Sequence, residues 1–388
     1  MRIASGWKRW VGGLAAAGLL GACSTVPVFG NPESSAAVQV PHHFFSVDWW
    51  TPLVNPTLLE YAPREFAQPA YDAKNERVIT LTRDGFARSV GPGGEVAWRF
   101  KAGNRFYAGA TVDEGIAYVP GTDGLLYALD ARTGEVKWKY AAGEALATAP
   151  VLTRDFVLVA SQSDTLFAVR RASGELAWLY RRDPPTGFTI HRSSTPTVRG
   201  DVAWVGFSDG TLVSLDLTDG SVRWERSLAP TGVAAGQFLD VDTAPALDEA
   251  GRVYAASYAG GLYALEAETG DVVWSSVAQG ITSVMVHGEV VVATGDDRLD
   301  AYLGETGKLL WSQTLQERAG FEPVLVKGML LVPAQRSLLF VDPRTGRSRL
   351  AWNPGDGISA PPRVVGARMY VLSNNGYLYA VRLDGRSG

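Results

Sequence analysis

The residue types that most often carry out chemistry are few in this chain and stand apart from one another. There is a single cysteine, Cys23. The four histidines are scattered: His42, His43, His191 and His287. With one cysteine, neither a disulfide framework nor a cysteine-based metal site is available. Asp296-Asp297 fits a hairpin turn, and the glycines of 91–94 lack the lysine and helix of a phosphate-binding loop. We predict no catalytic residue, no metal ligand and no cofactor.

Cys23 ends an N-terminal segment that is typical of a secretion signal. A basic start precedes an apolar run over residues 10–20, which suits a signal-peptide core and is too short to cross a bilayer as a helix. The run ends in Leu-Gly-Ala-Cys, which looks like a bacterial lipobox. We expect residues 1–22 to be a lipoprotein signal peptide and Cys23 to carry the lipid, including palmitate. The alternative is an ordinary secretory leader with an incidental cysteine.

The residues after the cysteine indicate where such an anchor would hold the protein. In lipoproteins of this kind an aspartate after the cysteine often means inner-membrane retention, whereas here the residue is Ser24. We therefore expect a lipid-anchored outer-membrane protein that faces the periplasm. Residues 23–41 are rich in Pro, Ser, Ala and Val, and we predict a flexible tether. The net charge is −4 and no basic stripe points to nucleic acid.

The rest of the chain is organised by one repeated pattern. Its clearest copy is DGLLYALDARTGEVKW, Asp123–Trp138. The second glycine of the pattern recurs about every 40 residues, at Gly94, Gly134, Gly174, Gly220, Gly270, Gly307, Gly346 and Gly385. In the first six copies a tryptophan follows four residues later: Trp98, Trp138, Trp178, Trp224, Trp274 and Trp311. A period of this length with short β-rich runs is typical of a β-propeller.

Each copy divides into four short runs rich in β-branched and aromatic residues, separated by turn signals. In the third copy the runs are Ala149–Leu152, Phe156–Ser161, Thr165–Arg170 and Glu175–Tyr180. We predict an all-β, eight-bladed propeller of four-stranded antiparallel blades, forming a single domain over residues 42–388. The recurring tryptophan lies on the outermost run and is expected to pack between adjacent blades. The alternative role is stacking on a ligand.

The eighth copy lacks its outermost strand, which would leave the ring open with an unpaired edge. It supplies three runs, Pro361–Val365, Met369–Ser373 and Tyr377–Leu383. Near the N-terminus, Ser46-Val-Asp-Trp49 matches Glu135-Val-Lys-Trp138 in register. We therefore predict that residues 44–53 complete the last blade. The alternative is an irregular segment before the first blade.

The blade pattern A-x-D-x-x-T-G-x-x-x-W resembles that of the pyrroloquinoline-quinone-type propellers over about residues 44–385. Two groups of that superfamily fit the size of the chain: the quinoprotein dehydrogenases and the BamB family. The lipobox, the eight blades and the absence of other domains look like the BamB family of β-barrel assembly lipoproteins. That resemblance implies a non-enzymatic scaffold, monomeric within a hetero-oligomeric complex. Its partners would be the barrel-forming subunit BamA and unfolded outer-membrane proteins, whose folding and insertion it would aid.

Two swollen gaps in the repeat, Gly174–Gly220 and Gly220–Gly270, are the candidate partner surface. Long loops on a rigid scaffold often carry recognition. The second loop ends in Asp-Val-Asp-Thr-Ala-Pro, as loops of the BamB family do, and the first holds apolar residues beside an arginine. The resemblance implies partner contacts by Phe188, Ile190, His191, Arg192, Phe238, Leu239, Asp240 and Asp242, with the family's arginine falling on His191 or Arg192. The alternative is that the loops only cap the propeller, with the two aspartates bonding local backbone amides.

Two other functional classes remain open from the sequence. A quinoprotein dehydrogenase must hold a quinone and a calcium ion, and many such enzymes place the quinone against a disulfide of adjacent cysteines, which this chain lacks. A propeller lipoprotein can also serve as a sensor or scaffold elsewhere in the cell envelope, because propellers host many functions.

Overall fold

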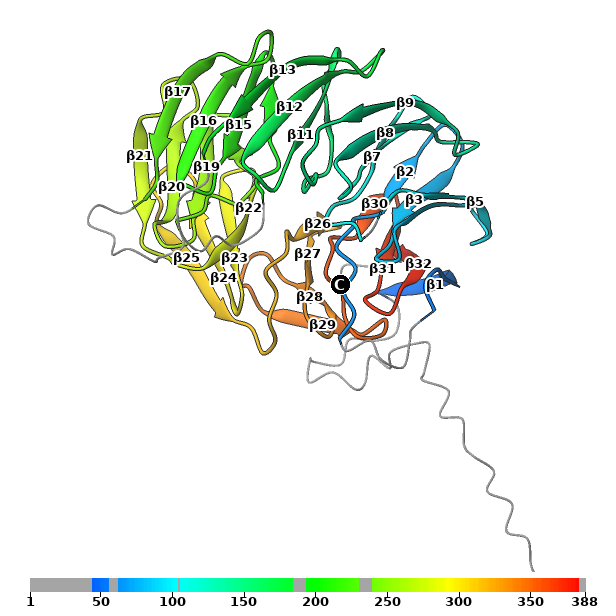
Figure 1. Ribbon diagram of the computed structural model, residues 1–388. Coiled ribbons are helices and arrows are strands. Elements are labelled where there is room, and N and C mark those ends of the chain that lie inside the picture. The colour runs from blue at the N-terminus through cyan, green and yellow to red at the C-terminus, as the bar shows by residue number, and fades with distance from the viewer. Residues whose placement is uncertain (1–43, 56–61, 104, 184–192, 230–238, 384–388) are drawn as a thin grey trace, which may run out of the picture.

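The computed structural model describes residues 44–55, 62–103, 105–183, 193–229 and 239–383. These residues form strands and connections, arranged as eight four-stranded antiparallel sheets around a common axis (Figure 1). The predicted all-β, eight-bladed propeller is therefore confirmed. Over the same ranges no helix is long and apolar enough to cross a membrane.

Seven of the blades use four consecutive strands, which run from the axis to the rim. They are blade 1, β2 (Ala70–Asp72), β3 (Arg77–Leu81), β4 (Phe86–Val90) and β5 (Val96–Lys101); blade 2, β6 (Thr111–Asp113), β7 (Ile116–Pro120), β8 (Leu125–Asp130) and β9 (Val136–Ala141); blade 3, β10 (Val151–Leu152), β11 (Phe156–Ala160), β12 (Thr165–Arg170) and β13 (Leu176–Arg181); blade 4, β14 (Thr197–Arg199), β15 (Val202–Gly206), β16 (Thr211–Asp216) and β17 (Val222–Ser227); blade 5, β18 (Ala246–Leu247), β19 (Arg252–Ser257), β20 (Gly261–Glu266) and β21 (Val272–Ser276); blade 6, β22 (Ile281–His287), β23 (Val290–Gly295), β24 (Arg298–Leu303) and β25 (Leu309–Thr314); and blade 7, β26 (Val324–Val326), β27 (Met329–Pro333), β28 (Leu338–Val341) and β29 (Ser348–Trp352). Three of the four runs predicted for the third copy match their strands to within one residue. The innermost run begins two residues later than predicted, after Pro150, whose ring nitrogen has no hydrogen to donate to the ladder.

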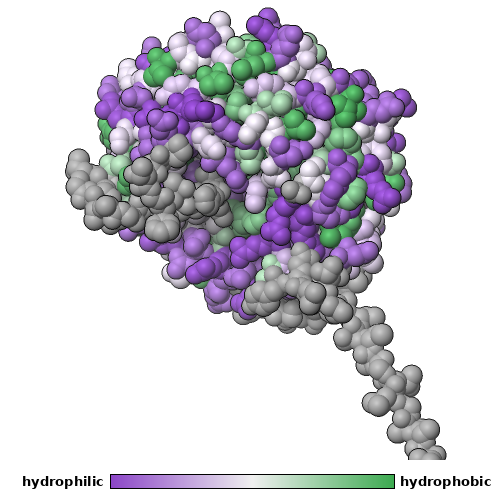
Figure 2. All heavy atoms as spheres, in the orientation of Figure 1, coloured by the Kyte–Doolittle hydropathy of each residue, from purple (hydrophilic) through white to green (hydrophobic). Residues whose placement is uncertain are grey.

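The core lies between the blades. There are eight apolar clusters among the described residues, and each joins the facing sides of two adjacent blades. Strand β8 shows how this works, because Leu126 and Ala128 face blade 3 while Tyr127 and Leu129 face blade 1. The outer strands alternate instead between half-buried and exposed positions, so the surface is mostly hydrophilic with scattered apolar side chains (Figure 2).

A tryptophan on each of seven outer strands locks one blade to the next. The indole of Trp138 lies against Gly174, where an added Cβ would stand 2.7 Å from the ring. Its Nε1 donates a hydrogen bond to the carbonyl of Arg171 at 3.1 Å. Gly174 also has a φ of +76°, which a side chain would strain. The same lock forms in six further pairs: Trp49–Gly94, Trp98–Gly134, Trp178–Gly220, Trp224–Gly270, Trp274–Gly307 and Trp311–Gly346. The predicted packing between blades is observed.

Between blades 7 and 8 the lock is replaced by a cluster of aromatic rings. The tryptophan position of blade 7 is Leu350, which pairs with the bulky Phe340 on the neighbouring strand. In the other blades the residue opposite the tryptophan is an alanine or a serine. Phe44 meets the Phe340 ring edge-on at 5.2 Å, and Phe45 stacks on it at 5.6 Å. The volume that the indole fills elsewhere is supplied here by residues from the N-terminus.

The N-terminal strand closes the ring. Strand β1 (Phe45–Pro52) pairs antiparallel with β32 (Tyr377–Leu383), and blade 8 continues inward through β31 (Arg368–Leu372) and β30 (Arg363–Val365). Trp49 stands opposite Ala380, in the register of the other tryptophans, and its Nε1 donates to the carbonyl of Pro92 in blade 1 at 2.6 Å. The prediction that residues 44–53 complete the last blade is confirmed.

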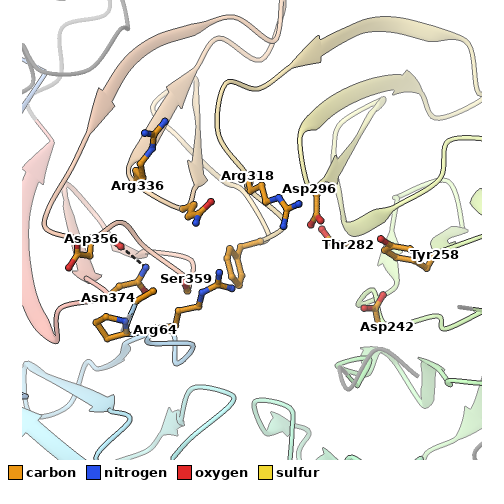
Figure 3. Close-up of a pocket in the computed structure, with 15 residues that line it drawn as sticks. Arg64, Asp242, Tyr258, Thr282, Asp296, Arg318, Arg336, Asp356, Ser359 and Asn374 are labelled. Atoms are coloured by element: carbon orange, nitrogen blue, oxygen red, sulfur yellow. Dashed lines mark hydrogen bonds between the residues drawn. The ribbon is translucent and has the colours of Figure 1, made fainter. Parts of the chain in front are cut away.

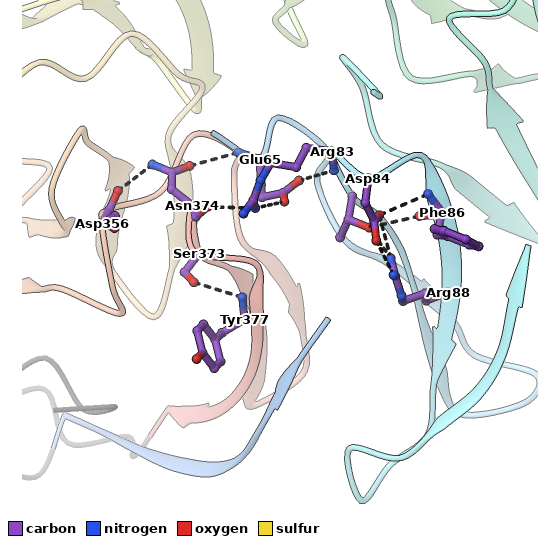
Figure 4. Close-up of polar contacts among 10 residues, drawn as sticks. Glu65, Arg83, Asp84, Phe86, Arg88, Asp356, Ser373, Asn374 and Tyr377 are labelled. Atoms are coloured by element: carbon purple, nitrogen blue, oxygen red, sulfur yellow. Dashed lines mark hydrogen bonds and ion pairs between the residues drawn. The ribbon is translucent and has the colours of Figure 1, made fainter. Parts of the chain in front are cut away.

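A buried polar network reinforces this closure near the axis (Figure 4). Glu65, which is 1% exposed, forms an ion pair of 2.5 Å with Arg83 and accepts a hydrogen bond from the Arg83 backbone N–H at 2.8 Å. The Glu65 N–H donates to Asn374 Oδ1 at 3.2 Å, and Asn374 Nδ2 donates to the Asp356 carbonyl at 2.8 Å. Blade 1 is thereby bonded to the turn of blade 8 and to the connection before it. Burial raises the pKa of Glu65 to about 7, although Arg83 acts in the opposite direction.

We expect Trp138→Ala to lower the free energy of unfolding by about 3–5 kcal/mol, because it removes a buried indole and leaves a cavity between blades 2 and 3. Denaturant unfolding followed by circular dichroism measures the change. The matched control is Val136→Ala on the same strand, whose side chain is exposed, and there the expected change is within about 0.5 kcal/mol. Equal effects of the two substitutions would contradict the packing role.

Deleting residues 44–53 is expected to lower the unfolding temperature and to promote association, because β32 becomes an open edge and the aromatic cluster on Phe340 loses two rings. Calorimetry and light scattering measure the two effects. A variant lacking only residues 24–41 of the predicted tether serves as the control. The closure argument fails if the strand deletion leaves a monomer of unchanged stability.

The raised pKa of Glu65 predicts a pH dependence of stability. The unfolded chain releases this proton near pH 4.5, whereas the folded protein holds it until about pH 7, so the free energy of unfolding should fall as pH rises through that window. We expect wild type to lose more stability between pH 5 and pH 8 than Glu65→Gln. Urea unfolding at both pH values gives the comparison, with the exposed Glu268→Gln as control. Identical pH dependence in wild type and Glu65→Gln would refute the assignment.

Candidate binding face at the axial pocket

Strand direction places the described ends of both swollen insertions on one face of the disc. Successive strands of a blade are antiparallel, so the connection from each outer strand to the next blade shares a face with the turn between the second and third strands. The insertions follow β13 and β17 and are connections of this kind. Of the predicted partner-binding residues, five lie outside the described ranges: Phe188, Ile190, His191, Arg192 and Phe238. Leu239, Asp240 and Asp242 lie within them.

The described end of the second insertion is embedded in the propeller. Asp240 is 1% exposed and Asp242 is 9% exposed. The backbone carbonyl of Leu239 accepts a hydrogen bond from Ser257 Oγ at 2.7 Å, and that of Asp240 accepts one from the Tyr258 N–H at 3.0 Å. This part of the loop is therefore held against blade 5 by its main chain, and both aspartates are presented from fixed backbone.

The ends of the two insertions are bonded to each other. Ser194, which follows the first insertion, donates its hydroxyl to the carbonyl of Thr243 at 2.8 Å. Ser193 donates in the same way to the carbonyl of Ser161 in blade 3 at 2.8 Å. The Thr243 hydroxyl accepts from the Ala256 N–H at 3.1 Å. The two insertions therefore end side by side over blades 3 to 5, although the sequence separates them by a whole blade.

Asp242 also belongs to a pocket of about 550 Å³ at the axis, on the same face (Figure 3). The pocket is lined mostly by turns and connections of several blades: residues 62–64 before blade 1, Asp242 and Tyr258 of blade 5, Thr282 and Asp296 of blade 6, Arg318, Ala319, Phe321, Gln335 and Arg336 of blade 7, and Asp356, Ser359 and Asn374 of blade 8. Asp296 does stand in a hairpin turn, as the sequence predicts, and it faces this pocket as well. The sequence analysis did not identify Arg64, Arg318 and Ser359 as pocket residues, because they lie in connections whose residue types the repeat pattern does not specify.

The pocket carries opposite charges in balance. Its cations are Arg64, Arg318 and Arg336, and its anions are Asp242, Asp296 and Asp356. Among the described residues, none of the three guanidinium groups forms an ion pair. Arg182 on the rim shows the contrast, since it pairs with both Asp209 and Glu225. No group of three or more metal-ligating side chains occurs in the described ranges. The arrangement is suited to holding a polar or charged ligand by hydrogen bonds.

Solved structures with the same fold include two of different function. The crystal structure of BamB from Moraxella catarrhalis aligns with a TM-score of 0.75 and 22% sequence identity, covering 87% of this chain and 100% of that one. Quinohemoprotein alcohol dehydrogenase from Comamonas testosteroni aligns with a TM-score of 0.70 and 13% identity, covering 89% of this chain and 77% of that one. At such identities the likeness concerns the fold alone.

Sequence comparison separates the two. An outer membrane protein assembly factor BamB from Legionella pneumophila is 33% identical over 198 residues, 49% of this chain, and the one from Escherichia coli is 28% identical over 200 residues, 50% of this chain. The chain spans about half the length of these curated relatives. The family model described as outer membrane protein assembly factor BamB matches residues 83–303 and 295–388. Because that match covers most of the propeller, the chain belongs to the BamB family.

Proposed function

We propose that this protein is a non-enzymatic scaffold of outer-membrane protein assembly, anchored to the outer membrane through lipid on Cys23 and facing the periplasm. The observation that carries the proposal is the match of the BamB family model along the propeller, residues 83–303 and 295–388. The names of the curated relatives describe those proteins as outer membrane protein assembly factors. The closed ring, with a lock at each described outer tryptophan, supports a rigid platform rather than a moving part.

The partner of this platform would be the periplasmic region of the barrel-forming subunit BamA, bound by the two insertions. Three features support this surface: the insertions leave the same face, their ends are bonded through Ser194 and Thr243, and the backbone beneath them is buried. In an effective protein–protein interface, apolar anchors form the buried centre and charged residues surround them as a rim. In that arrangement Phe188 and Phe238 enter the partner, Arg192 pairs at the rim, and Asp240 acts through the backbone that it helps to hold.

Such a scaffold works by position and involves no bond chemistry. A lipid on Cys23 and the tether of residues 23–41 keep the propeller close to its partner, which raises their effective concentration, so a modest interface stays occupied. The bound propeller would then help to orient unfolded outer-membrane proteins for folding and insertion by BamA.

The partner surface is tested by the double variant Phe188→Glu with Arg192→Glu. We expect it to lose capture of a purified periplasmic fragment of BamA by about tenfold or more, because it removes an apolar anchor and reverses a charge at the interface. Surface plasmon resonance on the mature protein gives the affinity. The control, Leu309→Glu with Arg347→Glu, places two like changes at exposed positions away from the insertions.

Normal capture by the double variant would refute the assigned surface while leaving the scaffold role intact. Absence of capture by the wild-type protein, with the fold confirmed by circular dichroism, would refute the partner itself and favour a different role in the cell envelope.

A further inference from the structure

Blade 6 carries a buried aspartate where the other blades have larger side chains. Asp300 is 4% exposed and lies on β24, one residue before Ala301, which stands opposite Trp311. The residue at the equivalent position is larger in each of the seven other blades: Arg88, Tyr127, Phe167, Val213, Tyr263, Leu339 and Tyr379. A buried carboxylate costs stability that an apolar side chain would not, so packing of the blades does not account for Asp300.

The residue across from Asp300 on β23 is also small, and the two line a pocket. That residue is Ala293. Five other blades have a valine in its place: Val119, Val159, Val205, Val332 and Val371. The pocket has a volume of about 300 Å³ and lies between blades 5 and 6. This volume is at the lower end of the range for ligand pockets, so it suits one side chain or a small molecule.

One carboxylate oxygen of Asp300 is left without a partner. Its Oδ2 pairs with Arg298 Nε at 2.8 Å and accepts a hydrogen bond from the Tyr302 hydroxyl at 3.4 Å. Its Oδ1 is buried and, within the described ranges, accepts no hydrogen bond. Arg88, the other charged residue at this position, shows the contrast, because Asp84 of its own blade pairs with it. Nearly all buried polar atoms in proteins have a partner, so Oδ1 is a place for a donor from a ligand.

The charges of this pocket favour a cationic donor. Three aspartates line it, Asp296, Asp297 and Asp300, against two arginines, Arg298 and Arg318. Arg298 is held by Oδ2 of Asp300, and in Figure 3 the side chain of Arg318 lies beside Asp296. Asp297 and Oδ1 of Asp300 remain as acceptors, so a cation is attracted and an anion is repelled. Because the described ranges hold no group of three or more metal-ligating side chains, an organic cation fits this donor set better than a metal ion.

The same pocket offers apolar surface for the stem of such a cation. Ile281 and Ala293 line it, and each is 2% exposed. Both belong to the apolar cluster that joins blades 5 and 6. An alkylammonium group combines a methylene stem, which packs on side chains of this kind, with a charged head that donates three hydrogen bonds. A hydrogen bond between an ammonium and a carboxylate is of the strong, charge-assisted kind.

We propose that the pocket between blades 5 and 6 binds an alkylammonium group, with Asp300 Oδ1 accepting a hydrogen bond from the ammonium, Asp297 adding negative charge, and Ile281 packing against the stem. Lysine side chains and small amines carry such a group. The site does not require BamA. It lies on the face where the two insertions end, because the β21–β22 connection and the β23–β24 turn line it.

The test uses the mature protein alone and three probes. The first is a blocked octapeptide of glycine and serine that carries one lysine, the second is the same peptide with the lysine acetylated on Nζ, and the third is n-butylamine. Isothermal titration calorimetry gives each affinity at two salt concentrations. We expect the lysine peptide to bind about tenfold or more tightly than its acetylated twin, with binding weakened by salt. Tighter binding of the lysine peptide than of n-butylamine assigns the group to a peptide, whereas equal affinities assign it to a small amine.

Variants then assign the contacts. Asp300→Asn should weaken binding of the lysine peptide by about tenfold or more, because the amide carries no charge to pair with the ammonium. Ala293→Val should also weaken binding, because it fills the pocket with the residue of the other blades and leaves the charge unchanged. Asp155→Asn, at an exposed turn between the first two strands of blade 3, should leave binding unchanged.

Asp300→Leu separates a binding role from a structural one. Blade 7 has Leu339 at this position, and replacing a buried ion pair by an apolar side chain is often neutral or stabilising. We expect Asp300→Leu to lose binding and to keep or raise the unfolding temperature, measured by calorimetry. Equal binding of the two peptides, binding unchanged by both Asp300→Asn and Ala293→Val, binding retained by Asp300→Leu, or no binding at millimolar lysine peptide would overturn the proposal.

Discussion

The contact on which the ring depends is the indole of one blade lying on the turn glycine of the next. A single blade is apolar on both faces and cannot bury them alone, so stability comes from interfaces between blades. The indole covers the outer end of each interface, and its Nε1 hydrogen bond to a backbone carbonyl sets the relative height of the two sheets. Glycine is required at this turn for two reasons: its φ is positive, and the Cβ of any other residue would collide with the indole ring.

The interface without this lock shows what the others require. At blades 7 and 8 the tryptophan is replaced by Leu350, and the missing volume is restored by Phe44 and Phe45 stacking around Phe340. These rings flank the strand that completes blade 8, so the two ends of the fold are joined where the repeat is weakest. The predicted lipid anchor would thus connect to a strand held by an antiparallel ladder along β32, by aromatic packing and by ion pairs of Asp48.

The repeated parts of the chain and the candidate binding surface lie in different places. The repeat supplies the strands and the tryptophan–glycine contacts, which have the same structural role in each blade. The connections vary, and they gather on one face because antiparallel strands return every blade-to-blade connection to that side. Asp242 is both the buried end of an insertion and a wall of the axial pocket.

The number of blades, the strands of the third and eighth repeats and the closure by residues 44–53 were determined by the sequence itself, because each follows from a local pattern repeated in register. The burial of Asp240 and Asp242 could not be read in this way, since it depends on turns of neighbouring blades that close over them. The lining of one pocket by Arg64, Arg318 and Ser359 was decided by the tertiary structure alone. Only closure of the ring brings connections from its two ends to one axis, and no periodicity along the chain encodes that convergence.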